Sequence, residues 1–402
     1  MLNGSFHDCR YQIHLTTQAA SIFFFVGALA MLGCSSSSTT AEGTEASLHE
    51  RYADYFAIGA AVDSTSYKDA HVPLLTKHFN SIVCENEMKW ESLQPTEGVF
   101  DYTTADQIVA FAEANNMAVR GHCLVWHSQT PSWVFVDQSD APVTKEILID
   151  RMRNHITNVV THFRGRVSAW DVVNEAITGN KEDGEDAGED LSLVQSWGYR
   201  NSDWYKIGGE DYILEAFRAA RAADPDAKLF YNDYWNYLDE KREAIISMIE
   251  KLKSENLIDG VGLQCHLNIE PAQEKLTNQT VHQTVENLEN EIKAYAALGL
   301  EVHITELDVS MYTRDYGSSD ESKWHRTEAE LTDALKDKHA TRYKEFFDMF
   351  RRNSELIGNV TFWGVADDNT WLSEFDSGRP DYPLLFDKQL KPKKAFYSVT
   401  DF

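Results

Sequence analysis

Short apolar runs alternate with longer amphipathic stretches along most of this chain. Eight largely apolar runs have the length of buried strands, and the stretches between them repeat apolar residues at helical spacing. The expected strands are 58–62, 81–85, 118–125, 167–174, 228–233, 260–266, 301–306 and 360–365. The clearest expected helices are 104–115, 145–162, 211–223 and 328–355. Apolar strands separated by helices predict a parallel sheet with both faces covered.

Eight strand–helix units predict an α/β fold of the (β/α)8 (TIM) barrel type, built as a single domain. A doubly wound open sheet is the competing architecture, and it is expected to carry a phosphate-binding glycine loop after its first strand. The sequence contains neither a GxGxxG nor a GxxxxGK(S/T) motif. We therefore favour the barrel and expect no cofactor.

The N-terminal residues have the pattern of an export signal. Arg10 precedes the apolar run 21–32, which is too short to span a membrane. Gly33-Cys34 then resembles a bacterial lipoprotein cleavage site, with a Ser/Thr-rich segment behind it. These features predict a lipoprotein-type signal peptide (1–33), lipidation of Cys34, a flexible tether (34–47) and one folded domain (48–402). Ordinary signal cleavage with complete release is the alternative.

This reading predicts an exported protein, either a bacterial outer-membrane or cell-surface lipoprotein or otherwise a secreted one. The net charge of −27 argues against a nucleic-acid partner, because phosphate binding requires a basic face. Any membrane contact is expected only through the lipid anchor. The acidic segment 178–197 could be a calcium loop, but it lacks a D-x-D-x-D-G spacing, so a solvated loop is the preferred interpretation.

Reactive and polar residues recur where the predicted strands end. In a (β/α)8 barrel these ends meet at one face, where active sites lie. Two glutamates, Glu175 and Glu306, stand at the ends of the fourth and seventh strands. The other candidates are Glu85, Asn86, Lys89, His122, Trp126, Asn174, Gln264, His266, Asp308, Trp363 and Trp371.

Facing glutamates with amide and aromatic neighbours indicate glycosidic bond cleavage. One carboxyl must be protonated and the other ionised, and the mutual repulsion of the pair is expected to separate their pKa values. Trp90, Trp126, Trp363 and Trp371 offer flat faces for sugar rings. Each residue alone has an ordinary structural explanation, such as an ion pair or a core position. No HExxH zinc motif or local serine-hydrolase signature competes.

Seven ordered blocks resemble the endo-β-1,4-xylanases of glycoside hydrolase family 10, and the resemblance covers residues from about 50 to 402. The blocks are ENEMKW (85–90), GHCLVWHSQ (121–129), WDVVNEA (170–176), YNDY (231–234), DGVGLQCH (259–266), ITELDV (304–309) and WGVADDNTW (363–371). The resemblance implies a retaining, endo-acting enzyme on xylan that works by double displacement. A related β-1,4-glucanase or aryl-β-glycosidase and a non-catalytic polysaccharide-capture protein remain alternatives.

The resemblance also implies a role for each candidate. Glu175 would be the acid/base beside Asn174, and Glu306 the nucleophile, oriented by His266 and Asp308. Sugar binding would fall to Glu85, Asn86, Lys89, His122, Trp126, Gln264, Trp363 and Trp371.

Cys84, Cys123 and Cys265 lie beside cleft residues. A Cys/His metal site is conceivable there, but side chains alternate along a strand, so we expect buried thiols facing the helices and no metal.

Overall fold

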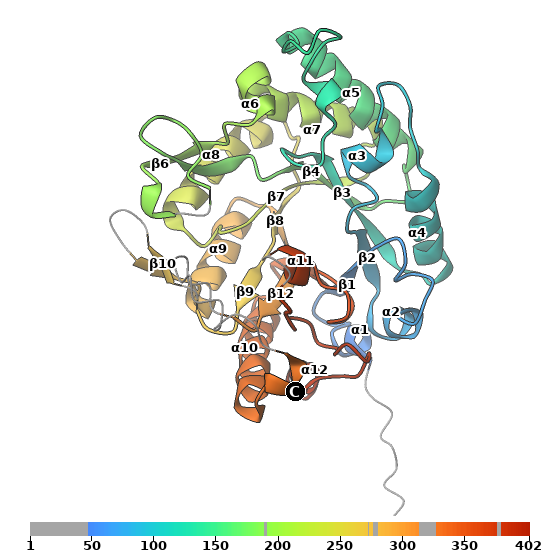
Figure 1. The fold of residues 1–402 in the computed structure, drawn as a ribbon, viewed down its shortest axis with the longest axis vertical. Helices are drawn as coiled ribbons and strands as arrows, with labels where there is room; N and C mark the ends of the chain where they lie inside the picture. Colours follow the sequence, from blue (N-terminus) through green and yellow to red (C-terminus); the bar gives the residue numbers. More distant parts are fainter. Residues whose placement is uncertain (1–46, 189–190, 272, 276–279, 313–326, 376–378) are drawn as a thin grey trace, which may run out of the picture. The chain divides into compact units, whose positions relative to one another are not determined.

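The computed structural model describes residues 47–402, apart from 189–190, 272, 276–279, 313–326 and 376–378 (Figure 1). The predicted signal peptide, the tether and Cys34 lie outside the described residues. The described residues fall within one compact unit, Ala46–Phe402. None of their helices is both long enough and apolar enough to cross a lipid bilayer.

Eight parallel strands form a closed barrel, as predicted. The last strand pairs with both the first strand and the seventh, which closes the sheet on itself. The barrel strands are β1 (Ala57–Val62), β2 (Ser81–Cys84), β3 (Ala118–Val125), β4 (Ala169–Asn174), β7 (Lys228–Asp233), β8 (Gly260–Leu263), β12 (Glu301–Ser310) and β13 (Ile357–Phe362). Consecutive strands are neighbours throughout, so every strand end reaches the same face of the barrel.

Helices surround the strands in Figure 1 and bury their apolar faces against them. The principal helices are α2 (Val72–His78), α4 (Thr103–Ala114), α5 (Lys145–His162), α7 (Asp211–Ala223), α8 (Asp239–Ser254), α9 (Val285–Ala297), α10 (Asp333–Arg352) and α12 (Lys394–Thr400). Threonine side chains cap three of them: Thr144, Thr284 and Thr332 each accept a hydrogen bond from a first-turn backbone N–H. The bounds of α5 and α7 match the sequence prediction.

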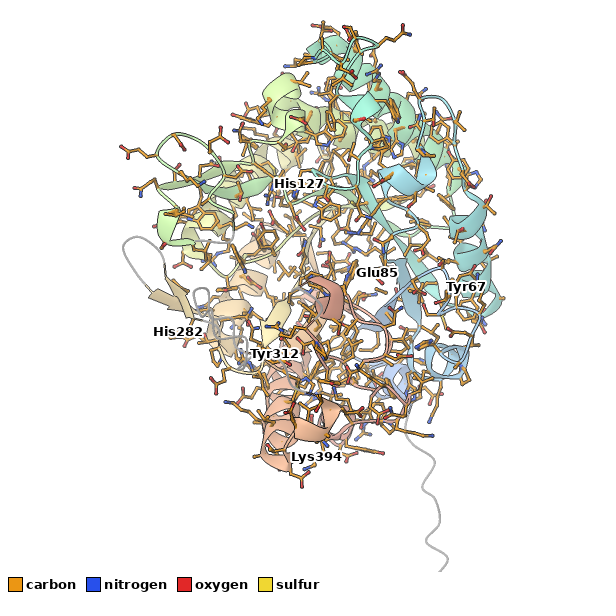
Figure 2. The ribbon with its side chains drawn as sticks, in the orientation of Figure 1. Tyr67, Glu85, His127, His282, Tyr312 and Lys394 are labelled. Carbon is orange, nitrogen blue, oxygen red and sulfur yellow. The ribbon has the colours of Figure 1, made fainter. Side chains whose placement is uncertain are left out.

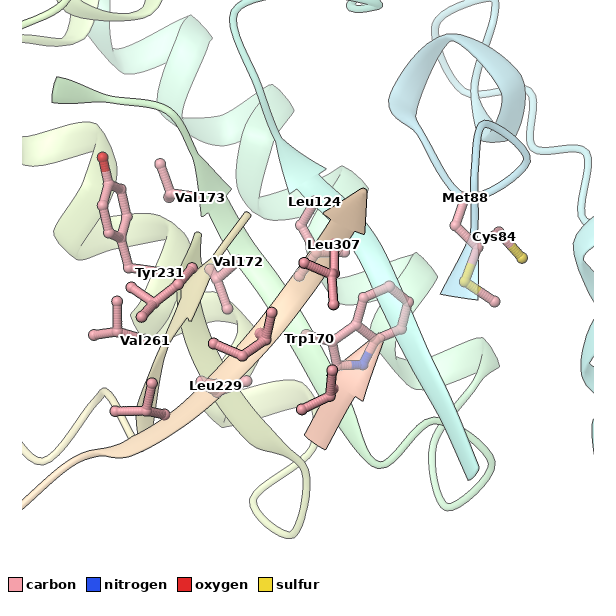
Figure 3. Close-up of a cluster of buried hydrophobic side chains, with 14 of the residues drawn as sticks. Cys84, Met88, Leu124, Trp170, Val172, Val173, Leu229, Tyr231, Val261 and Leu307 are labelled. Atoms are coloured by element: carbon pink, nitrogen blue, oxygen red, sulfur yellow. The ribbon is translucent and has the colours of Figure 1, made fainter. Parts of the chain in front are cut away.

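The core is built from apolar side chains of adjacent strands and the helices outside them (Figure 3). Trp170, on β4, is fully buried and lies against Phe163 with their ring centroids 6.2 Å apart. Its ring requires Gly121 on β3, because a Cβ atom at that position would come within 2.1 Å of the indole. Packing this dense fixes the positions of the strands and therefore of the residues at their ends.

Several predicted elements differ from the structure. The long helix expected over 328–355 spans Asp333–Arg352, and the seventh strand extends to Ser310. The run 260–266 is interrupted, because Cys265 adopts a left-handed conformation (φ 57°) and separates β8 from the short strand β9 (His266–Asn268). The last strand begins at Ile357 instead of 360. The acidic segment, expected to be a loop, instead forms an antiparallel hairpin of β5 (Ile177–Asn180) and β6 (Ser196–Tyr199) at its two ends.

Candidate active site

A cavity of about 690 Å³ lies at the carboxyl ends of the strands. Twelve of the thirteen predicted catalytic, supporting and substrate-binding residues line it; the thirteenth, Asp308, lies behind His266. Figure 2 labels two residues of its wall, Glu85 after β2 and His127 after β3. The strand ends therefore converge on one cleft, as the barrel prediction required. The lining candidates are Glu85, Asn86, Lys89, His122, Trp126, Asn174, Glu175, Gln264, His266, Glu306, Trp363 and Trp371.

Glu306 is fixed on strand β12 by one partner at each carboxylate oxygen. Its Oε1 accepts a hydrogen bond of 2.7 Å from the amide of Asn232, and its Oε2 lies 3.1 Å from Nε2 of His266. The other ring nitrogen of His266 lies 2.9 Å from Asp308. The indole N–H of Trp371 donates to the same oxygen of Asp308 over 2.9 Å. These bonds fix both the position and the rotation of the Glu306 carboxylate.

His266 carries a positive charge in this arrangement. Burial disfavours its charged form, but the adjacent carboxylates of Asp308 and Glu306 outweigh burial and raise the pKa of His266 to about 10. The imidazolium therefore bridges two carboxylates at neutral pH. His266 thereby supplies a charged hydrogen-bond donor to the Glu306 carboxylate.

Glu175 follows β4 directly, in a left-handed backbone conformation (φ 56°) that is unusual for a residue with a side chain. Its Oε1 accepts hydrogen bonds from Gln264 (2.8 Å) and Asn174 (3.2 Å). Its Oε2 accepts one from the indole of Trp126 (2.9 Å), and His127 lies 3.8 Å away. Neutral donors thus hold most of this carboxyl group.

The pKa of Glu175 departs from the expectation drawn from the sequence. Burial raises this pKa, but His127, Arg200 and the hydrogen bonds from Gln264 and Trp126 together lower it below its ordinary value. The expectation of a carboxyl group kept protonated by its partner is therefore wrong for the unliganded protein. Burial also lowers the pKa of His127 to about 4, so that residue is neutral near pH 6. A neutral His127 no longer lowers the pKa of Glu175 through its charge.

Lys89 organises another wall of the cleft. Its ammonium group donates to Asn86 (3.1 Å) and Gln129 (2.8 Å) and lies 4.7 Å from the ring centroid of Trp126. Gln129 also donates to Asn86 over 3.2 Å. This closed set of partners holds a cation and two amides at fixed positions, where they can donate to and accept from sugar hydroxyls.

His122 and the two remaining tryptophans complete the cleft. His122 is held through a 3.0 Å contact between its Nδ1 and Asp171, and Arg120 neutralises that aspartate. The Trp363 ring meets His122 edge-on with centroids 5.3 Å apart, and Trp371 packs against the cluster that Trp363 forms with Ala61 and Val83. Aromatic rings and polar side chains therefore both line the cavity, a combination typical of ligand-binding clefts.

The family model for glycosyl hydrolase family 10 matches residues 47–402. This chain belongs to glycosyl hydrolase family 10. A β-1,4-xylanase of Dictyoglomus thermophilum is 43% identical over 359 residues, covering 89% of this chain and 91% of the relative. The endo-1,4-β-xylanase A of Thermotoga maritima is 41% identical over 358 residues, covering 88% of this chain and 30% of the relative. This chain therefore spans less than a third of the Thermotoga protein.

A solved structure agrees with these relatives. The crystal structure of xylanase B from Clostridium stercorarium F9 matches with a TM-score of 0.78 at 38% identity, covering 89% of this chain and all of that chain. The single (β/α)8 domain of this family 10 chain is thus confirmed.

Asn232 was passed over by the sequence analysis as a site residue, although it connects the two sides of the cleft. Its amide donates both to Asn174 (2.9 Å) and to Glu306 (2.7 Å), and it accepts a hydrogen bond of 2.6 Å from Thr305. Gly262, on the adjacent strand, makes room for it, since a Cβ atom there would come within 2.2 Å of its side-chain oxygen. Its position at the end of a predicted strand could have identified Asn232 as a site residue.

Arg200 was also missed, because it follows the acidic insertion and no predicted strand end marks it. Its guanidinium donates to the backbone oxygen of Glu175 (2.9 Å) and to the hydroxyl of Tyr234 (2.8 Å). It thereby attaches strand β6 of the insertion to the Glu175 side of the cleft.

Two expectations about side chains at the cleft are wrong. Trp90 is not a sugar platform: it is 2% exposed and stacks on His155 with centroids 3.7 Å apart. Cys265 does not face the helices but lines the cavity, because its left-handed backbone breaks the alternation of side chains. Cys84 and Cys123 are buried free thiols, as expected. Among the described residues, no group of three or more His, Cys, Asp or Glu side chains is placed to hold a metal ion.

Proposed function

We propose that this family 10 chain hydrolyses internal β-1,4-xylosidic bonds of xylan with retention of anomeric configuration. The carrying observation is the pair of glutamates lining one cavity, with Glu306 held between Asn232 and a positively charged His266. A retaining glycosidase requires one carboxylate that can attack the anomeric carbon and another carboxyl that exchanges a proton with the glycosidic oxygen.

In the first step, Glu306 attacks the anomeric carbon and forms a glycosyl ester while Glu175 donates its proton to the departing oxygen. The bond between the anomeric carbon and that oxygen breaks, and the shortened chain leaves with the proton. Asn174 and Asn232 are placed to hydrogen-bond the sugar and the attacking carboxylate. His266 donates a charge-assisted hydrogen bond to the Glu306 carboxylate and supports Glu306 as a leaving group when the ester breaks.

In the second step, Glu175 acts as a base. It accepts a proton from a water molecule as the water oxygen attacks the anomeric carbon, and the ester bond to Glu306 breaks. The two inversions together give retention. Glu175 then holds the proton for the next cycle, and Glu306 returns to its carboxylate form.

Protonation of Glu175 is coupled to substrate binding in this proposal. The donors that lower its pKa, Gln264 and Trp126, both line the cavity and can turn to sugar oxygens. A bound sugar that takes over these donors and excludes water removes stabilisation from the carboxylate, so the pKa of Glu175 rises. The remaining cavity residues Glu85, Asn86, Lys89, His122, Trp363 and Trp371 bind the sugars around the cleavage point.

The decisive experiment is NMR analysis of linear xylan during digestion. We expect the first product to carry the β-anomer and to be an oligosaccharide released from inside the chain. Initial release of the α-anomer would overturn retention, and release of xylose alone would overturn internal cutting. Faster digestion of cellulose or mixed-linkage glucan would assign the barrel to glucans, and xylan binding without any product would indicate a capture protein.

We also propose that the protein is exported and anchored through lipid on Cys34. Arg10, the apolar run 21–32 and Gly33-Cys34 support this assignment. Mass spectrometry of the mature N-terminus should find diacylglycerol on Cys34, and Cys34→Ala should release the protein from the membrane fraction. An unmodified N-terminus beyond Cys34 would contradict the proposal.

A further inference from the structure

The turn after β4 brings Glu175 into the cleft against the alternation of the strand. Side chains on a strand point alternately to its two faces, so the residue after Asn174 is expected to face the helices. Glu175 nevertheless lines the same cavity as Asn174, because its left-handed backbone (φ 56°) turns the side chain back. A residue other than glycine keeps such a conformation only where its surroundings hold it there. The position of the Glu175 carboxyl group therefore depends on the groups that hold this turn.

The hydroxyl group of Tyr231 binds the backbone of this turn. Its oxygen accepts hydrogen bonds from two consecutive backbone N–H groups, those of Ala176 (3.0 Å) and Ile177 (3.1 Å). A hydroxyl group has two acceptor positions and one proton, and the proton is donated to Asp233. All the hydrogen-bonding positions of this hydroxyl are thus occupied. Tyr231 belongs to β7, the neighbour of β4 in the barrel, and its ring lies in the apolar core (Figure 3).

A buried ion pair fixes the other end of this series of hydrogen bonds. The ammonium group of Lys241 lies 2.8 Å from Oδ1 of Asp233, and both side chains are fully buried. The backbone N–H of Tyr234 donates to the same oxygen over 2.8 Å. Oδ2 of Asp233 accepts from the Tyr231 hydroxyl. Hydrogen bonds in series polarise one another, so the carboxylate makes the Tyr231 oxygen a stronger acceptor for the two N–H groups.

Burial keeps these groups away from a substrate. Tyr231 and Lys241 are 0% exposed and do not line the cavity, and the proposed reaction gives neither of them a role. A buried ion pair is also weak evidence for stability, because apolar residues of similar size often serve the fold equally well. The orientation that the pair gives to the Tyr231 hydroxyl accounts for its position directly behind the Glu175 turn.

We propose that Tyr231 is a positioning residue for proton transfer. Its hydroxyl, oriented by Asp233 and Lys241, holds the turn that places the Glu175 carboxyl group at the glycosidic oxygen. This inference rests on the proposed function, because it requires that Glu175 transfers the proton. Glu306 is held through other side chains on other strands. Loss of the hydroxyl should therefore impair proton transfer and leave the attack by Glu306 intact.

The experiment compares two substrates on Tyr231→Phe, which removes the hydroxyl and keeps the ring. A linear xylo-oligosaccharide needs a proton on its leaving oxygen, whereas a dinitrophenyl xylobioside does not. We expect kcat/KM to fall about 10–100-fold for the oligosaccharide, through kcat and not KM, and to change less than about twofold for the dinitrophenyl substrate. Both values are measured on one preparation, so their ratio does not depend on the fraction of protein that is folded.

Tyr52→Phe is the matched control. Tyr52 is also fully buried, and its hydroxyl donates to the backbone of Val399 and accepts from Arg351 over 3.1 Å. Its loss should lower the melting temperature without changing the ratio of the two kcat/KM values.

A second variant reaches the same turn through the ion pair. Asp233→Asn combined with Lys241→Met removes both charges together, and it should change the ratio in the same direction by a smaller factor, because Tyr231 keeps an acceptor. An unchanged ratio in either variant would overturn the proposal. So would a Tyr231→Phe protein that does not fold, because the hydroxyl would then be required for the fold itself. A Glu175→Ala protein that loses both substrates equally would instead overturn the proposed function.

Discussion

Glu306 and Glu175 face the same cavity, but their surroundings differ in kind. A charged histidine and an amide hold Glu306, and the histidine is itself fixed by Asp308. Glu175 is held mainly by neutral donors that also line the cleft. The Glu306 carboxylate thus contacts a cation, whereas the Glu175 carboxylate accepts its hydrogen bonds from neutral side chains that a bound sugar can also engage. One residue type thus acquires two roles from its neighbours.

The largest effect is expected when Glu306, the proposed nucleophile, is replaced. Glu306→Ala should lower kcat on xylan about 10⁴–10⁶-fold, because no other group can form the glycosyl ester. Steady-state assays of purified protein, with circular dichroism to verify the fold, measure the loss. Azide added to this variant should yield an α-glycosyl azide from an activated aryl xylobioside. Ordinary turnover without azide would reassign the nucleophile.

Removal of the acid/base should have an effect that depends on the leaving group. Glu175→Ala should nearly abolish cleavage of xylan, whose leaving oxygen needs a proton, yet retain bond breaking in a dinitrophenyl xylobioside, whose leaving group does not. Pre-steady-state kinetics should show a burst of nitrophenolate, because the second step lacks its base. Equal losses on both substrates would show that Glu175 does not transfer the proton.

The charge on His266 can be tested through Asp308. Asp308→Asn keeps the size of the side chain but removes the largest influence that raises the pKa of His266 from its ordinary value to about 10. Because the imidazolium then loses its proton at lower pH, kcat/KM should fall about tenfold at pH 8 and less at pH 5. A pH–rate profile measures this. Parallel profiles for variant and wild type would mean that His266 acts without its charge.

Glu291 is a third buried carboxyl group, and its surroundings differ from those of both Glu175 and Glu306. Burial raises the pKa of Glu291 to about 8, since no described residue donates to its Oε2. Its folded pKa lies above the unfolded value near 4.5, so its favourable contribution to stability is complete below that value and is lost as pH rises through 8. The melting temperature of Glu291→Gln relative to wild type should therefore rise by about 2–4 °C as the pH is raised from 5 to 8.5. A constant difference across that range would contradict the shift.

The barrel and most of the cleft were predictable because both follow from periodicity. Apolar strands separated by amphipathic helices predict a closed parallel barrel, and a barrel places every strand end at one face. Residues such as Glu175, Lys89 and Trp363 could therefore be grouped from their positions in sequence. Local backbone conformation was not predictable in this way: the left-handed residue Cys265 ended the sixth strand early and turned its own side chain into the cavity.

The contacts of individual side chains could not be predicted from the sequence either. Trp90 and Trp126 stand on either side of one strand in sequence and look equivalent, yet Trp90 is covered by His155 while Trp126 reaches Glu175. The lowered pKa of Glu175 depends in part on Arg200, which follows the β5–β6 hairpin. The acidic composition of that segment had predicted a loop, so the hairpin was not expected. Such effects depend on distances between residues far apart in the chain.

The chain end at Phe402 lies beside the first described helix. Arg51 donates to the backbone of Thr400 over 2.9 Å, and its guanidinium lies 4.7 Å from the ring centroid of Phe402. Both contacts involve Arg51, which precedes the start of strand β1, whereas the cleft residues follow the strand ends. Immobilising the protein through a peptide added after Phe402 would therefore present the cleft to an insoluble fibre instead of to the support.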